Sequence, residues 1–503
     1  MPLPVEIAWI CPVCGYIHYG SEPPESCPVC GVGREMFEEY RETAPVPGDE
    51  GKNTAAWRCG SCGFVHYGVE PPENCPVCGQ PTAVFTKLEE SEGVDGNTEQ
   101  KVIIVGAGIA GVTAAEAIRK ANPVAEIKLI SKEMHLPYYR LNLTRYLAGE
   151  VEKDQMILHP ADWYRDHAID LLTGVEVTGI DVPRKYVILS NGEAAAYDRL
   201  ILATGSKPII PPFPGADRNN VTALRTIEDA DLILNACGQG KKFVCIGGGI
   251  LGLEIAGALA ARREDVTVLE IQPWLMPRQL NENAAMFFKK NVESHGIRVF
   301  TGVRIKEITG EKYVTGILLE DGKKLPADLA IISAGVQVDT GIVKEAGIKT
   351  NHGIVVDAEM KTDTPAIYAA GDAAEINGLL YGTWGPSQGQ GTIAGLNVIG
   401  RRTDFSTVPR SNTLKVMGIN LFSIGEINPI PHGALVQETG QGEKYTCLVF
   451  NRNRLVGAIL LGDTSGSAAI KKLIEEKTEF ADTVINQSEV ADILNSLLKN
   501  QVV

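Results

Sequence analysis

Residues 101–120 read KVIIVGAGIAGVTAAEAIRK, and this stretch decides the fold. A β-branched apolar run leads into a glycine-rich turn and then into a helical pattern, which predicts a strand, a turn and a helix. Gly106 would make the turn, Gly108 would let the backbone approach a pyrophosphate, and Gly111 would let helix and strand pack closely. Glu133, near the end of the next strand, could accept hydrogen bonds from ribose hydroxyls. The stretch therefore predicts a dinucleotide site.

A second unit of this kind occupies residues 241–270, KKFVCIGGGILGLEIAGALAARREDVTVLE. Its glycines are Gly247, Gly249 and Gly252. Glu270 ends the following strand, where a carboxylate would repel a 2′-phosphate, so we expect NADH rather than NADPH. Arg262 and Arg263 precede that strand and could still admit the phosphate. Two nucleotide sites in one chain suggest two cofactors that exchange a hydride.

The wider pattern predicts an α/β protein of several domains. Strands and helices alternate between the two glycine-rich units, which predicts a mostly parallel sheet in each of two domains. Beyond about residue 411 the pattern becomes a run of strands followed by helices, which predicts a third, smaller α+β unit. The chain has 503 residues, of which 44% are hydrophobic and 22% charged, so it can bury sizeable cores.

Charge and hydropathy exclude several classes of partner. The net charge of −15 argues against nucleic acid and against an anionic membrane surface. No uncharged apolar stretch reaches about 18 residues, so we expect no membrane span. The first residues lack the features of a secretion signal, so we expect a cytoplasmic protein. The first 100 residues hold 16 acidic and 5 basic side chains, which marks them as a distinct acidic unit.

This acidic unit contains an internal repeat. Residues 9–31 recur as residues 57–79, with 16 of 23 positions identical, and each copy reads W-x-C-x-x-C-G-x-x-H-Y-G-x-E-P-P-E-x-C-P-V-C-G. Each copy is too short to build an apolar core, so a metal must hold it together. Two C-x-x-C turns per copy supply four thiolates for tetrahedral coordination. The predicted ligands are Cys11, Cys14, Cys27 and Cys30 in the first site and Cys59, Cys62, Cys75 and Cys78 in the second.

Spacing alone does not choose between iron and zinc, because both accept four thiolates. Both copies resemble the short rubredoxin-type domain found at the end of rubrerythrins, which implies one redox-active iron in each. Zinc ribbons share part of this pattern, so zinc remains the alternative. His18 and His66 recur in both copies, but four thiolates already complete each site, so neither is predicted as a ligand.

Five segments between residues 101 and 404 resemble the motifs of FAD-dependent pyridine nucleotide-disulfide oxidoreductases. In chain order they are GAGIAG, LPYYRLNL, YDRLILATGSKP, GGGILGLE and TDTPAIYAAGDAAE. Within that superfamily, SKEMHLPYYR and SNTLKVMGINLFSIGE look most like NADH:rubredoxin oxidoreductases and the flavoprotein half of assimilatory nitrite reductases. The resemblance implies FAD in the first site and NADH in the second.

The implied fold class is α/β, with two interleaved Rossmann-like (FAD and NAD) domains and a C-terminal α+β domain, preceded by two small four-cysteine metal-binding rubredoxin-like modules. The expected boundaries are 1–48 and 49–100 for the modules, 101–224 and 344–404 for the FAD domain, 225–343 for the NAD domain and 405–503 for the C-terminal domain.

The resemblance also implies roles for individual residues. Arg140 matches an arginine near the isoalloxazine, and Glu254 matches a residue that often lies near the nicotinamide, although a helix-surface charge is the alternative reading for Glu254. The stretch TWGPSQGQGTIAG matches a helix whose positive N-terminal end faces the flavin pyrimidine. The other predicted cofactor residues are Ile109, Ala110, Ala203, Thr204, Gly205, Ile250, Gly371 and Asp372, the last matching the carboxylate that holds the ribityl chain.

The remaining cysteines argue against a thiol relay. Relatives that reduce disulfides carry cysteines on the first helix after the FAD strand, whereas this chain has none between Cys78 and Cys237. Cys237, Cys245 and Cys447 are expected to be structural thiols. The electrons of the flavin would then leave through the two thiolate sites, with no side chain acting as acid, base or nucleophile.

We therefore expect an NADH-dependent flavoprotein reductase that passes electrons from NADH through FAD to Fe(Cys)4 centres on the same chain, and possibly on to an external one-electron redox protein. One alternative is a flavin NADH oxidase or acceptor reductase whose modules are zinc ribbons. Another is a flavin-dependent subunit of a larger redox complex. The sequence leaves open the oligomeric state, the physiological acceptor and the direction of electron flow.

Overall fold

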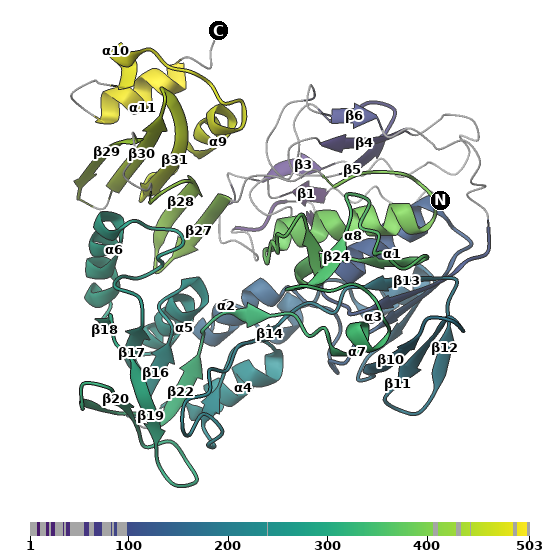
Figure 1. Ribbon diagram of the computed structural model, residues 1–503, viewed down its shortest axis with the longest axis horizontal. Coiled ribbons are helices and arrows are strands. Elements are labelled where there is room, and N and C mark those ends of the chain that lie inside the picture. Colours follow the sequence, from purple (N-terminus) through teal and green to yellow (C-terminus); the bar gives the residue numbers. More distant parts are fainter. Residues whose placement is uncertain are drawn as a thin grey trace. The chain divides into compact units, whose positions relative to one another are not determined.

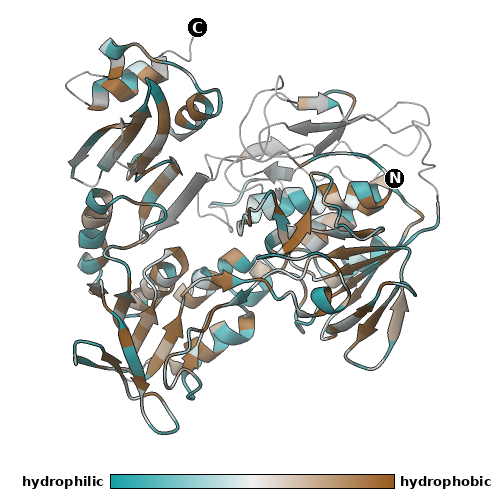
Figure 2. Ribbon diagram, viewed as in Figure 1, coloured by the Kyte–Doolittle hydropathy of each residue, from teal (hydrophilic) through white to brown (hydrophobic). Residues whose placement is uncertain are grey.

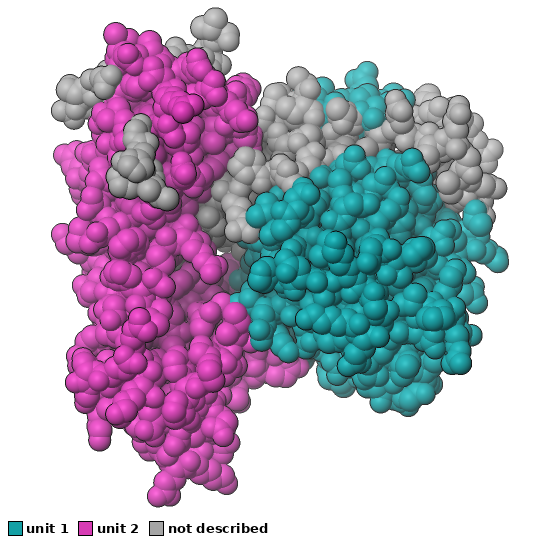
Figure 3. All heavy atoms as spheres, in the orientation of Figure 1, with its two compact units in different colours: residues 1–142, 151–207, 336–408 teal, residues 143–150, 208–335, 409–503 magenta. Residues whose placement is uncertain are grey.

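The computed structural model describes residues 8–10, 17–19, 22–25, 34, 37–40, 55–59, 65–72, 82, 85–87, 98–238, 240–405, 411–428, 434–442, 444–485 and 490–499. It divides into two compact units, each assembled from separated pieces of the chain (Figure 3). Unit 1 comprises residues 1–142, 151–207 and 336–408, and unit 2 comprises residues 143–150, 208–335 and 409–503. The six domain boundaries expected from the sequence remain predictions, because this division is coarser.

A five-stranded parallel sheet, in the order β25-β13-β7-β8-β9, forms the core of unit 1 (Figure 1). Its strands are β7 (Lys101–Val105), β8 (Glu126–Ile130), β9 (Ile169–Leu172), β13 (Arg199–Leu202) and β25 (Ile367–Ala369). Strand β7 is buried after its first residue, as expected for a parallel strand that is covered on both faces. Helix α1 (Ile109–Ala121) follows β7 directly, so the predicted strand, turn and helix are confirmed.

Helix α1 packs closely against α8 (Trp384–Val398), the helix that carries the GPSQGQG sequence. Glycines make this approach possible. A β-carbon at Gly391 would overlap the carbonyl oxygen of Ala110, and one at Gly395 would lie 2.5 Å from the carbonyl oxygen of Ala114. The backbones of the two helices therefore touch through positions without side chains.

Smaller elements complete unit 1. They are the antiparallel sheet β10 (Val177–Asp181), β11 (Tyr186–Leu189) and β12 (Ala194–Ala196); the parallel pair β24 (Ile354–Val356) and β26 (Ala374–Ile376); the helices α3 (Ala161–Asp166) and α7 (Gly341–Glu345); and the 3-10 turns η3 (Arg140–Asn142), η4 (Lys153–Met156) and η5 (Gly371–Ala373). The two-residue strands β14 (Lys207–Pro208) and β23 (Val336–Gln337) stand where the sequence leaves and re-enters this unit.

Unit 2 contains a second five-stranded parallel sheet, in the order β15-β22-β16-β17-β18. Its strands are β15 (Val221–Thr222), β16 (Lys242–Ile246), β17 (Asp265–Glu270), β18 (Arg298–Thr301) and β22 (Leu329–Ile332). Its helices are α2 (Leu143–Ala148), α4 (Ile227–Ala236), α5 (Ile250–Ala261) and α6 (Glu282–Ser294), and an antiparallel sheet is formed by β19 (Ile305–Thr309), β20 (Gly316–Leu319) and β21 (Lys324–Pro326). Hydrophobic residues dominate β16 and β22 (Figure 2).

The C-terminal part of unit 2 is the α+β unit that the sequence predicts. Five antiparallel strands run in the order β27-β28-β31-β30-β29, and three helices follow them. The elements are β27 (Ser411–Val416), β28 (Ile419–Gly425), β29 (Ala434–Gln441), β30 (Lys444–Asn451), β31 (Arg454–Leu461), α9 (Ser467–Glu475), α10 (Asp482–Ile485) and α11 (Val490–Lys499).

The two N-terminal repeats share one strand topology. The first has the antiparallel order β2-β1-β3 and the second the order β5-β4-β6, and in both a tryptophan of the central strand lies opposite the repeated histidine. The strands are β1 (Ala8–Ile10), β2 (Ile17–Tyr19), β3 (Glu38–Tyr40), β4 (Ala55–Cys59), β5 (Val65–Gly68) and β6 (Phe85–Lys87). No helix in the described part of the chain is long and apolar enough to cross a membrane.

Candidate functional site

The three glycines of the first glycine loop, residues 106–111, differ in the space around them. Gly106 has φ +105°, and a β-carbon there would overlap the carbonyl oxygen of Ala203. A β-carbon at Gly111 would overlap the carbonyl oxygen of Gly106. Gly108, by contrast, has φ −73° and no atom within 4 Å of where its β-carbon would lie. A side chain is therefore excluded at Gly106 and Gly111 by the protein itself, whereas the space around Gly108 is open.

The second glycine loop, residues 247–252, has the same arrangement. Gly247 has φ +121°, and its β-carbon would overlap the carbonyl oxygen of Ser333, while a β-carbon at Gly252 would overlap the carbonyl oxygen of Gly247. Gly249 has φ −80° and again nothing within 4 Å. Both glycine loops therefore have open space at the middle glycine, which we call the first cradle (Gly108) and the second cradle (Gly249). The binding of a dinucleotide at each cradle remains a prediction.

Each cradle lies at the start of a helix that has no side-chain cap. Gly108 and Gly249 are the N-caps of α1 and α5, and neither helix has an acidic residue in its first turn. Ile109 and Ile250 are the first helical residues, and Ala110 is buried behind the first of them. The free N–H groups of each first turn are therefore available to an anion such as a pyrophosphate.

A charged cluster lies beside the first cradle in unit 1. The Arg140 guanidinium donates to the Glu133 carboxylate at 2.5 Å and to the Tyr138 hydroxyl at 2.9 Å, and that hydroxyl in turn donates to Glu133 at 2.7 Å. Burial by itself would lower the pKa of Arg140, but Tyr138 and Glu133 outweigh it, so the pKa is raised and the cation is secure. Because Glu133 is held by the protein, its predicted contact with a ribose remains a prediction.

Two serines that the sequence motifs did not predict hold the carboxylate of Asp372. The Ser206 hydroxyl donates to one oxygen of Asp372 at 2.9 Å, and the Ser387 hydroxyl donates to the other at 3.3 Å. Gly371, at φ +77°, donates its N–H to the Gln390 side chain at 2.9 Å. The signal was present in the sequence, since Ser206 follows the ATG turn and Ser387 lies in the first turn of α8.

The ATG turn itself lies directly beside the first glycine loop. Ala203 supplies the carbonyl that excludes a side chain at Gly106, the Thr204 hydroxyl is buried without a hydrogen-bond partner, and Gly205 has φ +69°. These residues therefore lie against the first glycine loop, and their contact with a flavin nucleotide remains a prediction.

Glu270 ends β17 and is 7% exposed. One carboxylate oxygen accepts from the Gly248 N–H and the other from the Gln272 N–H, both at 2.7 Å. The second cradle therefore has a fixed negative charge at its edge. Arg262, which the sequence offered as a partner for a 2′-phosphate, instead donates its Nε–H to the carbonyl oxygen of Leu147.

Glu254 lies on α5 and is half-buried. The Thr144 hydroxyl, from α2, donates to its carboxylate at 3.2 Å. Burial raises the pKa of Glu254 to about 7, and the Thr144 hydrogen bond opposes that shift in part. Thr144 was missed because it lies 110 residues before Glu254 in the chain.

The eight predicted metal ligands lie outside the described residues, except that Cys59 ends strand β4 and its side chain is not described. Within the described ranges, no group of three or more histidine, cysteine or acidic side chains could hold a metal ion.

The other three cysteines behave as structural thiols. Burial raises the pKa of Cys245 and of Cys447 to about 12, and burial also raises the pKa of the half-buried Cys237. A thiolate nucleophile is therefore disfavoured at each of them.

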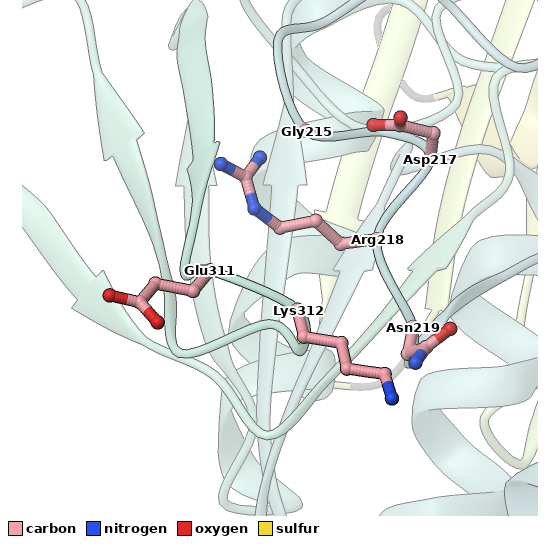
Figure 4. Close-up of a pocket in the computed structure, with 6 residues that line it drawn as sticks. All are labelled: Gly215, Asp217, Arg218, Asn219, Glu311 and Lys312. Atoms are coloured by element: carbon pink, nitrogen blue, oxygen red, sulfur yellow. The ribbon is translucent and has the colours of Figure 1, made fainter.

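A separate hollow opens on the surface of unit 2, between the loop after residue 214 and the turn before β20 (Figure 4). Its lining residues are Gly215, Asp217, Arg218, Asn219, Glu311 and Lys312. The Arg218 guanidinium is already hydrogen-bonded to the carbonyl oxygens of Gly310 at 2.8 Å and Ile308 at 2.6 Å. The Arg218 side chain in this hollow is therefore bound to backbone carbonyl groups, and the lining residues belong to neither cradle.

Comparison with protein families decides the assignment. Residues 100–392 match the pyridine nucleotide-disulphide oxidoreductase family. The chain belongs to that family. Residues 411–478 match the C-terminal domain of rubredoxin NAD+ reductase, and residues 9–38 and 57–86 each match the rubredoxin-like domain of rubrerythrin. The family resemblance and the fold class expected from the sequence are thus confirmed, together with a flavin and a nicotinamide nucleotide as the cofactors of the family.

Individual relatives agree with this assignment. The chain is 32% identical over 398 residues to an NADH-rubredoxin oxidoreductase of Clostridium acetobutylicum, covering 79% of this chain and 99% of that one. It is 35% identical over 388 residues to a nitrite reductase [NAD(P)H] of Bacillus subtilis, covering 76% of this chain and 48% of that one. It thus spans about half the length of that reductase and 51% of an assimilatory nitrate reductase electron transfer subunit from the same organism.

Solved structures show the same similarity. The crystal structure of the Clostridium acetobutylicum NADH:rubredoxin oxidoreductase superposes with a TM-score of 0.69 at 31% identity, covering 79% of this chain and all of that one. A putidaredoxin reductase, crystallised in a covalent complex with putidaredoxin, superposes with a TM-score of 0.72 at 27% identity, covering 80% of this chain and 99% of that one.

Proposed function

We propose that this protein is an NADH-dependent flavoprotein reductase that passes electrons through FAD to rubredoxin-type Fe(Cys)4 centres carried on its own N-terminal modules. The observation that carries the proposal is the pair of open cradles at Gly108 and Gly249, on a chain whose modules match the rubredoxin-like domain. Bound FAD would supply the conversion of a two-electron hydride donor into single-electron steps.

The residues of unit 1 suit FAD. The first turn of α1 would bind the pyrophosphate, and the serine-held carboxylate of Asp372 would accept from a ribityl hydroxyl. Arg140, whose raised pKa keeps it charged, supplies a positive charge beside this site. The protein's contribution is therefore orientation and electrostatics.

The residues of unit 2 favour NADH over NADPH. The buried Glu270 carboxylate places a negative charge where the 2′-phosphate of NADPH would lie, and Arg262 is committed to the Leu147 carbonyl. The sequence offered a second cation, Arg263, as a partner for a 2′-phosphate. Arg263 is exposed and has φ +65°. We therefore propose NADH as the electron donor, in the cytoplasm, where unpaired C-x-x-C thiols persist.

Iron rather than zinc in the modules is required by the proposal, because zinc has no redox chemistry. The test is anaerobic addition of NADH to the as-purified protein, with flavin and ferric-thiolate absorption followed separately. Bleaching of both sets of bands supports internal transfer. Bleaching of the flavin alone, or an elemental assay that finds only zinc, would show instead a flavin reductase with structural modules.

A further inference from the structure

The two N-terminal modules share one strand register but differ in charge. In the first module β1 pairs with β3 so that Trp9 lies opposite Glu39, and in the second β4 pairs with β6 so that Trp57 lies opposite Lys87. Residues 48 positions apart in the sequence therefore occupy equivalent places in the two sheets. Each charge that differs between the copies can thus be placed relative to the same predicted ligand.

The difference is concentrated next to the first predicted ligand of each module. The residue directly before that cysteine is Ile10 in the first module and Arg58 in the second. Glu38 lies opposite Ile10, whereas Thr86 lies opposite Arg58. Together with the glutamate and the lysine opposite the two tryptophans, the first module has two negative charges at these three positions and the second has two positive charges.

The rest of each copy does not offset this difference. Over the same 32 positions, residues 9–40 carry a net charge of −4 and residues 57–88 carry a net charge of zero. The Arg34 guanidinium of the first module pairs with Glu22 at 2.5 Å, so its charge is already balanced outside the third strand.

The acidic residues of the linkers stand farther along the chain from the ligands. Counted over residues 1–48 and 49–100, the net charges are −5 and −6, because acidic residues follow the second copy. The first of them, Glu89, stands four positions past Phe85, the residue opposite Cys59, and lies beyond the end of β6. The charges nearest to the ligands along the paired strands are therefore those that differ between the modules.

The first C-x-x-C turn differs in the same direction. Its inner residues are Pro12 and Val13 in the first module and Gly60 and Ser61 in the second, whereas the other turn reads C-P-V-C in both. Proline has no N–H group, so the first module has one backbone donor fewer in this turn, and it also lacks the serine hydroxyl. Hydrogen bonds to ligating sulfurs stabilise the negative charge that reduction adds, and so raise the reduction potential.

We infer that the two modules differ in reduction potential and that the second has the higher one, so that an electron delivered to either module comes to rest on the second. The four thiolates of each module suit iron. The exchange moves one electron from Fe(II) of the first module to Fe(III) of the second, and it breaks no bond and moves no proton. The inference rests on the proposed function, since it takes iron as the metal.

The magnitude follows from the charges. Reduction adds one negative charge to a thiolate-bound iron, so positive charges nearby stabilise the reduced form and negative charges destabilise it. A difference of four charges at about 10 Å, screened by solvent and salt, shifts the equilibrium between the two centres by on the order of tenfold. For a one-electron couple, a tenfold ratio corresponds to about 59 mV between the midpoint potentials.

The test is a redox titration of the full-length, iron-loaded protein. It follows the electron paramagnetic resonance signal of high-spin ferric iron, to which oxidised FAD does not contribute. We expect two one-electron steps of equal amplitude, separated by about 59 mV.

Two exchange variants assign the steps, because each gives one module the residues that the other carries at the same positions. Arg58→Ile with Lys87→Glu should lower the upper step until both steps merge near the lower potential. Ile10→Arg with Glu39→Lys should raise the lower step until both merge near the higher potential.

The matched control is Glu25→Gln with Glu73→Gln, which removes one charge from the same position of both copies and should keep the separation. A single step in the wild type, or a separation that survives both exchanges, overturns the inference. If NADH reduces the iron and the titration shows one step, this inference alone is wrong. If the steps separate as expected but NADH reduces only the flavin, the proposed function is wrong and the inference stands. A metal assay that finds only zinc overturns both.

Discussion

Alanine at the middle glycine of each cradle should separate the two nucleotide sites. Gly108→Ala places a methyl group in space that no protein atom occupies, at a φ of −73° that alanine adopts without strain. The free energy of unfolding of the cofactor-free protein should therefore change by less than about 1 kcal/mol. The methyl group would instead meet the pyrophosphate and displace it from the first turn of α1.

Loss of one hydrogen bond to a charged phosphate costs about 1.5–3 kcal/mol, which weakens FAD binding by about 10- to 100-fold. Gly249→Ala should weaken NADH binding by a similar factor and leave the FAD content unchanged, because it meets the same open space at φ −80°. The assay is equilibrium titration of FAD into deflavinated protein, and of 1,4,5,6-tetrahydro-NAD into the FAD-loaded protein.

Gly106→Ala is the matched control. Its φ is +105° and its methyl group would overlap the Ala203 carbonyl, so it should destabilise unit 1 even without cofactor. If Gly108→Ala binds FAD within twofold of wild type, or unfolds as readily as Gly106→Ala, the space at Gly108 is not where the pyrophosphate lies.

Three further substitutions test other parts of the site. Gly391→Ala overlaps α1 and should lower the unfolding free energy of unit 1 by about 1–3 kcal/mol in urea, whereas Gly385→Ala in the same helix, with nothing within 4 Å, should not; equal effects would contradict the proposed close packing. Arg140→Ala leaves the 19%-exposed Glu133 carboxylate with Tyr138 alone and should cost about 1–3 kcal/mol in the same assay, and a loss below about 0.5 kcal/mol would show that the pair is not stabilising. Glu270→Gln removes the charge at the edge of the second cradle and should narrow the preference for NADH over NADPH in kcat/KM by about tenfold, so an unchanged preference would remove Glu270 from cofactor selection.

The sequence predicted the two cradles because the constraint on a glycine is local. A positive φ at Gly106 or Gly247, and the tight approach of helix to strand, depend on a few neighbouring residues, so a short motif carries the information. The parallel sheets followed from the same alternation of strands and helices. The resemblance to the family rested on five segments in chain order, and the match of residues 100–392 to the family then confirmed it.

Partners far apart in the chain could not be predicted in this way. Thr144 meets Glu254 across 110 residues, and Ser206 meets Asp372 across 166, so only the folded chain reveals these hydrogen bonds. The sequence likewise left open whether Arg262 could meet a 2′-phosphate, and only the folded chain shows that its Nε–H donates to the carbonyl oxygen of Leu147.

The sheet of unit 1 has a consequence for the timing of synthesis. Its edge strand β25 pairs with β13, but all five strands of the second parallel sheet lie between them in the sequence, and 164 residues separate Leu202 from Ile367. At a translation rate of about 5–20 residues per second, β13 waits on the order of 10–30 s for its neighbour. During that interval the edge of the apolar strand β13 is exposed in the nascent chain. We therefore expect a chaperone to bind the nascent chain until residue 369 has left the exit tunnel of the ribosome.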